Sequence, residues 1–200
     1  MGVRPIKSDS IVCCFVFSGA TEFHVQPLAY EDTMTSLSMR LNEYYELFLD
    51  ETEANVGQQF LALSQGEVCA AKWTADNCWY RCCYVERASP SEIHGDFIDY
   101  GNSDRVAVQN LRVLPNRLKE ANVPRLALRC RDRCAERIHD RRAYKQRIEG
   151  NQLVLKIHDI NHETGLLTVE VFEIAIALTV PTSHVNISEQ LSTPSLALDD

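Results

Sequence analysis

Aromatic side chains gather around two short turns in the middle of the chain, and their spacing suggests one shared binding site. The candidate residues are Trp73, Tyr80, Phe97, Tyr100 and Asn102. The face of an aromatic ring carries partial negative charge and attracts a cation held over it, by about 0.5–2 kcal/mol per contact. A poorly hydrated cation, such as a methylated arginine or lysine side chain, suits such a site best. These residues therefore predict a site that binds a modified cationic side chain.

The run FIDYGN, from Phe97 to Asn102, combines two of these rings with a turn. In a regular strand Phe97 and Tyr100 would face opposite sides. Gly101 lets the backbone leave the strand conformation, so Tyr100 can turn back toward the face of Phe97. A planar guanidinium could then lie between two roughly parallel rings, while the amide oxygen of Asn102 accepts one of its remaining N–H groups.

We assign structural roles to three neighbouring features. Trp79 is adjacent to Tyr80 and must face the other side of a strand, so we expect it to pack in the core. Asp99 comes directly before Tyr100 and Gly101, and we expect it to accept hydrogen bonds in the turn. The pair Asp76-Asn77 is interpreted as a turn signal only.

The composition is that of an ordinary globular protein of 200 residues, with 45% hydrophobic and 24% charged residues. No apolar run approaches the roughly 20 residues that span a bilayer, so we expect no contact with a membrane. The first residues lack the apolar stretch of a signal peptide, which predicts a cytoplasmic protein whose eight cysteines are reduced. The cysteine spacings lack the two close ligand pairs of a structural zinc site. We expect no metal, no cofactor and no enzymatic activity.

The net charge of −8 is unevenly distributed. The segment from Arg112 to Glu149 carries twelve Lys and Arg against five Asp and Glu, so the rest of the chain is strongly acidic. An acidic surface attracts an Arg-rich peptide over long range. The alternative is a weak RNA contact through the basic stretch Arg125–Arg147, which would be steeply salt-dependent.

The hydrophobic pattern predicts many short strands and two helices. The expected strands are 11–17, 22–26, 67–73, 79–85, 93–98, 105–108, 125–130, 152–160 and 166–174. Apolar residues at intervals of three and four predict a helix from Asp32 to Leu49, with Asp32 at its N-terminal cap. A weaker helix is expected from Ala135 to Ile148, ended by Gly150.

These elements predict an α+β fold that is mostly β. Short strands within residues 60–115 indicate a small antiparallel barrel. Because a single hairpin is marginally stable alone, the first two strands should pair with the strands after Pro124. The barrel would then be inserted into a module made of residues 8–59 and 116–178, with a long linking helix at about 32–49 and a flexible tail at 179–200.

The order of elements and three motifs resemble an extended Tudor domain, in which a Tudor barrel is inserted in an OB-like (staphylococcal-nuclease-like) module. The motifs are WYR at 79–81, FIDYGN at 97–102 and LRVL at 111–114. The resemblance extends over roughly Ile11–Ile176, although the flanks match only in the order of their elements. Trp73 and Phe97 stand where other members can have a different aromatic ring.

The resemblance also implies a function. Extended Tudor domains of the PIWI/piRNA pathway bind symmetrically dimethylated arginine in Arg-Gly or Arg-Ala repeats of PIWI-clade Argonaute proteins. By that resemblance Trp73, Tyr80, Phe97 and Tyr100 form the cage, and Asn102 contacts the guanidinium. The expected location is a perinuclear germ granule, the nuage, where the protein would scaffold ribonucleoprotein assembly.

Two other interpretations of the same residues remain open. A methyl-lysine reader would use a similar aromatic cage. A scaffold that ignores methylation would bind the unmethylated Argonaute peptide, and its aromatic residues would then be largely structural. Some family members that have lost cage aromatics behave in this second way, but here all four positions are aromatic.

Overall fold

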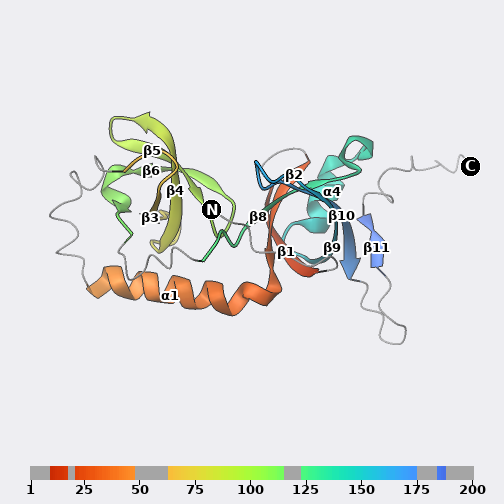
Figure 1. The fold of residues 1–200 in the computed structure, drawn as a ribbon, viewed down its shortest axis with the longest axis horizontal. Coiled ribbons are helices and arrows are strands. Elements are labelled where there is room, and N and C mark those ends of the chain that lie inside the picture. Colours follow the sequence, from red (N-terminus) through yellow and green to blue (C-terminus); the bar gives the residue numbers. More distant parts are fainter. Residues whose placement is uncertain (1–9, 18–20, 48–62, 115–122, 175–183, 188–200) are drawn as a thin grey trace, which may run out of the picture. The chain divides into compact units, whose positions relative to one another are not determined.

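The computed structural model describes residues 10–17, 21–47, 63–114, 123–174 and 184–187. These residues form two compact units (Figure 1). Each unit has its own hydrophobic core. The central unit consists of the described residues from Tyr30 to Leu126, and the flanking unit consists of those before Tyr30 and after Leu126. The chain therefore enters the flanking unit, leaves it to form the central unit, and returns. This is the predicted insertion of one β module into another.

The flanking unit is built on a sheet that closes on itself. Its strands are β1 (Ser10–Phe17), β2 (Glu22–Pro27), β8 (Leu128–Asp132), β9 (Gln152–Ile160), β10 (Leu167–Ile174) and β11 (His184–Asn186). The order is β11-β10-β8-β2-β1-β9, and β9 also pairs with β10, which completes a five-stranded ring. A small closed barrel of this kind is the expected OB-like architecture.

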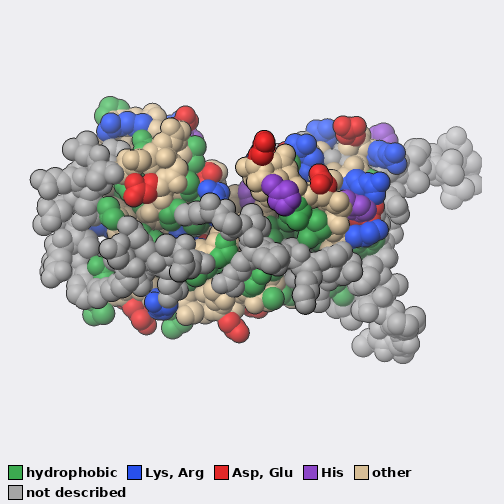
Figure 2. Space-filling view, in the orientation of Figure 1, with side chains coloured by type: hydrophobic (Ala, Val, Ile, Leu, Met, Phe, Trp, Pro, Cys, Tyr) green, Lys and Arg blue, Asp and Glu red, His purple; other side chains and the backbone are tan. Residues whose placement is uncertain are grey.

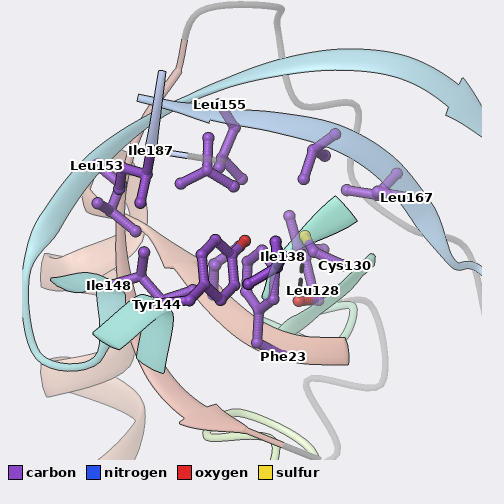
Figure 3. Packing of buried hydrophobic residues seen from close by; sticks show 13 residues of the cluster. Phe23, Leu128, Cys130, Ile138, Tyr144, Ile148, Leu153, Leu155, Leu167 and Ile187 are labelled. Carbon is purple, nitrogen blue, oxygen red and sulfur yellow. Dashed lines mark hydrogen bonds between the residues drawn. The ribbon is translucent and has the colours of Figure 1, made fainter. Parts of the chain in front are cut away.

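The core of the flanking unit fills this ring (Figure 3). Phe23 and Val25 on β2 face it together with Leu153 and Leu155 on β9, and all four are fully buried. Ile187, directly after β11, is also fully buried in this core. We assigned residues 179–200 to a flexible tail, and this is wrong for 184–187, because β11 pairs with β10. The other residues of that range lie outside the described ones.

The second helix is shorter than predicted. A 3-10 turn, η3 (Ala135–Arg137), comes first, and the helix α4 (Arg141–Ile148) follows it. Asp140 accepts a hydrogen bond from the backbone N–H of Ala143 and so caps the helix at its start. Gly150 has a φ of +75°, which explains why the helix ends where the glycine was expected to end it.

The central unit contains one long helix and a five-stranded antiparallel sheet. The sheet order is β6-β5-β4-β3-β7, so β4 lies in its middle. The strands are β3 (Val68–Lys72), β4 (Trp79–Ser89), β5 (Glu92–Phe97), β6 (Ser103–Ala107) and β7 (Leu111–Arg112). A 3-10 turn, η2 (Val108–Asn110), leads into β7. The short strands predicted within residues 60–115 are thus confirmed to within a few residues, although β4 is longer than expected.

The helix α1 (Glu31–Leu47) follows a 3-10 turn, η1 (Leu28–Tyr30). Leu37, Leu41 and Tyr45 form its buried face, and Tyr45 packs on Trp79 of β4 with ring centroids 4.5 Å apart. The predicted domain boundaries assigned this helix to the flanking module, but it packs on the strands of the central unit. Asp32 lies inside the first turn rather than at the cap. Within the described residues, no helix is long and apolar enough to cross a membrane.

Candidate functional site

The structure brings the four predicted aromatic residues together on one side of the central unit. Tyr80 is at the centre of the group, with its ring centroid 6.4 Å from Trp73, 6.1 Å from Phe97 and 5.1 Å from Tyr100. Trp73 and Phe97 are 6.3 Å apart. Three of the rings are partly exposed, whereas Phe97 is only 2% exposed. The group therefore consists of three partly exposed rings around a buried phenylalanine.

The connection between β3 and β4 positions Trp73 and Tyr80. Trp73 directly follows β3, and its backbone N–H donates to the carbonyl of Cys78. Asn77 has a φ of +60°, a conformation that asparagine tolerates better than most residues, and its N–H donates to the carbonyl of Trp73. This tight loop lets the two rings approach each other across the end of the hairpin.

The turn after β5 positions Tyr100, and its glycine allows the backbone to fold back as the sequence predicts. The backbone N–H groups of Tyr100 and Gly101 both donate to the carbonyl of Phe97, and Gly101 has a φ of +88°. The N–H of Phe97 donates in turn to the carbonyl of Asn102. The chain thus folds back on itself, and Tyr100 reaches Tyr80 on β4. The side chain of Asn102 is partly exposed beside this turn, and its contact with a ligand stays a prediction.

The rings meet edge to face rather than in parallel. The plane of Tyr80 makes angles of 75°, 87° and 81° with those of Trp73, Phe97 and Tyr100. Two stacked rings need roughly 7 Å between them to hold a planar group, because each contact takes about 3.5 Å. The neighbouring rings are closer than this. A guanidinium would therefore not fit between Tyr80 and these neighbours, and the parallel sandwich expected from Phe97 and Tyr100 stays a prediction.

Two carboxylates accept hydrogen bonds from the polar groups of Tyr80 and Trp73, and the sequence alone revealed neither bond. The hydroxyl of Tyr80 donates to Oδ2 of Asp76 at 2.6 Å, and Nε1 of Trp73 donates to Oδ2 of Asp104 at 3.2 Å. Burial, helped by the hydrogen bond to Asp76, raises the pKa of Tyr80 well above its ordinary value of 10, so the phenol stays neutral at physiological pH. Asp76 was interpreted as a turn residue only, and 31 residues separate Trp73 from Asp104.

Asp99 is structural, as predicted, but the partners that the structure shows for it lie outside the turn in which it was expected to accept hydrogen bonds. It is buried beneath the turn and forms a two-point ion pair with Arg81 of β4, with N–O distances of 2.5 and 2.8 Å. Arg81 also donates to the carbonyls of Val123 and Pro124, so both charges are well compensated. Trp79 faces the core and is 4% exposed, as predicted from its neighbour Tyr80.

The remaining charged and thiol groups provide no metal site in the part of the chain that the structure describes. No group of three or more His, Cys, Asp and Glu residues that could hold a metal ion occurs among the described residues. In the basic segment, Arg129 and Arg131 both pair with Glu22, Arg133 pairs with Glu170, and Arg147 pairs with Glu173. These arginines thus have structural partners, and RNA contact by this segment stays a prediction. Figure 2 shows one face of the molecule, on which Lys and Arg side chains are interspersed with Asp and Glu side chains.

The comparison with protein families agrees with these features. The model of the Tudor domain family matches residues 4–131, which is more than half of the chain. The chain belongs to the Tudor domain family. Among curated proteins, Tudor domain-containing protein 1 of Oryzias latipes is 28% identical over 114 residues, which are 57% of this chain and 9% of that protein. The human protein of the same name is 26% identical over 62% of this chain and 10% of its own length. The chain thus spans about a tenth of these relatives.

Solved structures show that the fold is that of extended Tudor domains. The extended Tudor domain of human TDRD1, solved with a symmetrically dimethylated peptide, has a TM-score of 0.75 at 18% identity, covering 94% of this chain and 90% of that one. A complex of Tudor with symmetrically dimethylated Aubergine has a TM-score of 0.69 at 21% identity, covering 91% and 98% of the two chains. Domain TD3 of mouse TDRD1, with a MILI peptide containing dimethylarginine, has a TM-score of 0.70 at 19% identity and covers 94% of each chain.

Proposed function

We propose that this domain is a binding module that recognises symmetrically dimethylated arginine in a peptide. The observation that carries the proposal is the convergence of Trp73, Tyr80, Phe97 and Tyr100 from two hairpins onto one group of rings. Dimethylation keeps the positive charge of the guanidinium but removes N–H donors and part of its hydration. Such a cation loses little when it leaves water and gains the attraction of the ring faces.

Membership in the Tudor domain family supports this interpretation. Related extended Tudor domains have been solved with dimethylated peptides, among them peptides of Aubergine and MILI. The first partner to test is therefore an Arg-Gly or Arg-Ala repeat from the N-terminal region of a PIWI-clade Argonaute protein. The protein would then act as a scaffold in cytoplasmic germ granules of the piRNA pathway, without catalytic activity of its own.

The chemistry of Asn102 favours methylarginine over methyl-lysine as the ligand to test. Asn102 lies two residues beyond Tyr100 and can accept a hydrogen bond from a guanidinium that keeps an N–H. A fully methylated ammonium has no N–H to donate to it. Replacing Asn102 by Ala should weaken arginine binding by about 1–3 kcal/mol, because a hydrogen bond with a charged partner is lost. Unchanged affinity would mean that Asn102 only shapes the turn.

The deciding experiment is a calorimetric titration with one Arg-Gly/Arg-Ala repeat peptide in four forms: unmethylated, symmetrically dimethylated, asymmetrically dimethylated, and with trimethyl-lysine in place of the arginine. We expect the symmetric form to bind at least about tenfold more tightly than the unmethylated one, which is about 1.4 kcal/mol. The variant Tyr100→Ala should lose this preference while its melting temperature changes little. Equal binding of all arginine forms would support the scaffold that ignores methylation.

A further inference from the structure

Asp76 and Asp104 connect two rings of the cage to the backbone in the same way. One carboxylate oxygen of Asp76 accepts from the backbone N–H of Cys78 at 2.9 Å, and the other accepts from the Tyr80 hydroxyl at 2.6 Å. One oxygen of Asp104 accepts from the N–H of Arg105 at 2.7 Å, and the other accepts from Nε1 of Trp73 at 3.2 Å. Each carboxylate is thus oriented by the backbone and in turn orients a ring.

The two carboxylates also place negative charge beside the rings. Among the ion pairs of the described residues, none joins Asp76 or Asp104 to a Lys, Arg or His, whereas the nearby Asp99 is paired with Arg81. The donors that orient the two carboxylates are neutral N–H and O–H groups. A hydrogen bond to a carboxylate polarises the O–H or N–H group of a ring and makes the ring face more negative. Both effects favour a cation over a neutral group of the same shape.

We propose that Asp76 and Asp104 are positioning and specificity-determining residues that make this cage select a charged side chain. They fix the orientation of Tyr80 and Trp73, and they supply the negative charge that the aromatic rings alone provide only weakly. The proposal rests on the function proposed above, because it concerns the same site. It adds that shape complementarity to the rings is not enough for tight binding, and that a neutral analogue of dimethylarginine binds more weakly because it gains nothing from the charge of these two carboxylates.

Conservative variants separate the two roles. Asp76→Asn and Asp104→Asn remove the charge and keep one oxygen that can accept the hydrogen bond of the ring, while the bond from the backbone N–H to the second oxygen is lost. Tyr80→Phe does the opposite, since it removes the hydrogen bond and keeps the charge of Asp76. Asp96→Asn is the matched control, because Asp96 is a partly exposed carboxylate on the neighbouring strand β5 that accepts from the hydroxyl of Ser103 instead of from a ring.

The test compares two peptides by calorimetry, one with symmetric dimethylarginine and one with its neutral urea counterpart, Nω-methylcitrulline, in which a carbonyl oxygen replaces one of the two methylated nitrogens. The double variant Asp76→Asn/Asp104→Asn should bind the charged peptide about tenfold or more weakly and the neutral one within about twofold of the original affinity. Its binding should also depend less on salt. Asp96→Asn should change either affinity by less than about threefold, as expected for a rim charge. Melting curves check that each variant is folded.

The possible failures can be told apart. Equal losses for the charged and the neutral peptide would mean that the carboxylates only support the rings, and this would overturn the selection of charge. An effect of Asp96→Asn as large as that of the double variant would overturn it too, because general surface charge would then be the cause. If the unaltered protein prefers the dimethylated peptide over the unmethylated one, the proposed function stands whatever these variants do. If it binds neither, both proposals are wrong.

Discussion

At the scale of single residues, Phe97 has two roles, one in the candidate binding site and one in the hydrophobic core. It is one of four rings in the candidate cage, and it is also 2% exposed in a core cluster with Cys82, Ile93 and Val106. Its neighbour Tyr100 is partly exposed and lies on the turn instead. A cage built in this way combines one ring that the core holds firmly with rings that can adjust to a ligand.

This difference predicts that truncating the two rings has different consequences. Phe97→Ala should lower the free energy of unfolding by about 3–5 kcal/mol, because it leaves a cavity in the core. Tyr100→Ala should cost much less stability and act mainly on ligand binding. Chemical denaturation of the two variants, followed by tryptophan fluorescence, measures both effects. Equal destabilisation would show that Tyr100 is as much a part of the core as Phe97.

The spacing of the aromatic residues, together with the resemblance to extended Tudor domains, predicted which rings meet, and strand alternation predicted that Trp79 faces inward. They could not reveal the bonds from Trp73 to Asp104 or from Arg81 to Asp99, which join residues 31 and 18 positions apart. Such pairs depend on the register of β3, β4, β5 and β6, and a shift of one residue in any pairing would break them. A turn residue such as Asp76 carries no local signal that its second oxygen will bind a ring.

At the scale of elements, the amide side chain of Asn42 adds two hydrogen bonds to the apolar packing of the helix α1 on the sheet. Oδ1 of Asn42 accepts from the backbone N–H of Trp79 at 2.7 Å, and its Nδ2 donates to the carbonyl of the same residue at 3.1 Å. This side chain therefore pairs with the first residue of β4 in the way that a neighbouring strand would. Hydrophobic periodicity predicts the apolar face of α1, but it does not predict the role of the polar Asn42 beside that face. That role becomes clear only from its partner, the backbone of Trp79.

Replacing Asn42 by Ala should therefore destabilise the central unit. Both backbone groups of Trp79 lose this partner at the edge of the core, which costs about 1–3 kcal/mol. Glu43→Ala is the control, since Glu43 is the next residue on α1 and is exposed. Thermal unfolding followed by tryptophan fluorescence compares the two variants. A loss of stability as small in Asn42→Ala as in the control would mean that water replaces the amide without cost.

Element boundaries were predicted less well than element order. The strand expected at Arg125–Cys130 begins only at Leu128, because the segment around Pro124 and Leu126 is engaged with Arg81 and Asp99. The helix expected from Ala135 begins at Arg141, because Asp140 caps it there. In both cases a specific polar contact, rather than the hydrophobic pattern, sets the first residue of the element.

At the scale of the whole chain, the insertion topology follows from the weakness of an isolated hairpin. The strands β1 and β2 need β9 and β8 as their outer neighbours, and these lie more than one hundred residues further along the chain. The marginal stability of a lone hairpin predicts such a return. The role of β11 could not be predicted in this way, because a three-residue strand in a polar, Pro-containing segment has no hydrophobic pattern to reveal it.

This topology predicts that the two units differ in their tolerance of truncation. A chain that begins at Tyr30 lacks β1 and β2, so β8 and β9 lose these neighbours and the flanking core loses Phe23 and Val25. The central unit keeps all its strands and its own cores. We therefore expect the flanking unit to unfold while the central unit stays folded.

The two tryptophans make this prediction easy to test, since Trp73 and Trp79 both belong to the central unit. In the truncated chain their fluorescence should keep its emission maximum and its melting transition, while circular dichroism loses part of the strand signal. Phe23→Ala in the full chain is the milder counterpart and should weaken only the flanking unit, again by about 3–5 kcal/mol. A shift of the tryptophan emission toward that of exposed indole would contradict this prediction. It would mean that the central unit depends on the flanking strands for its stability. The two units would then fold as one cooperative system.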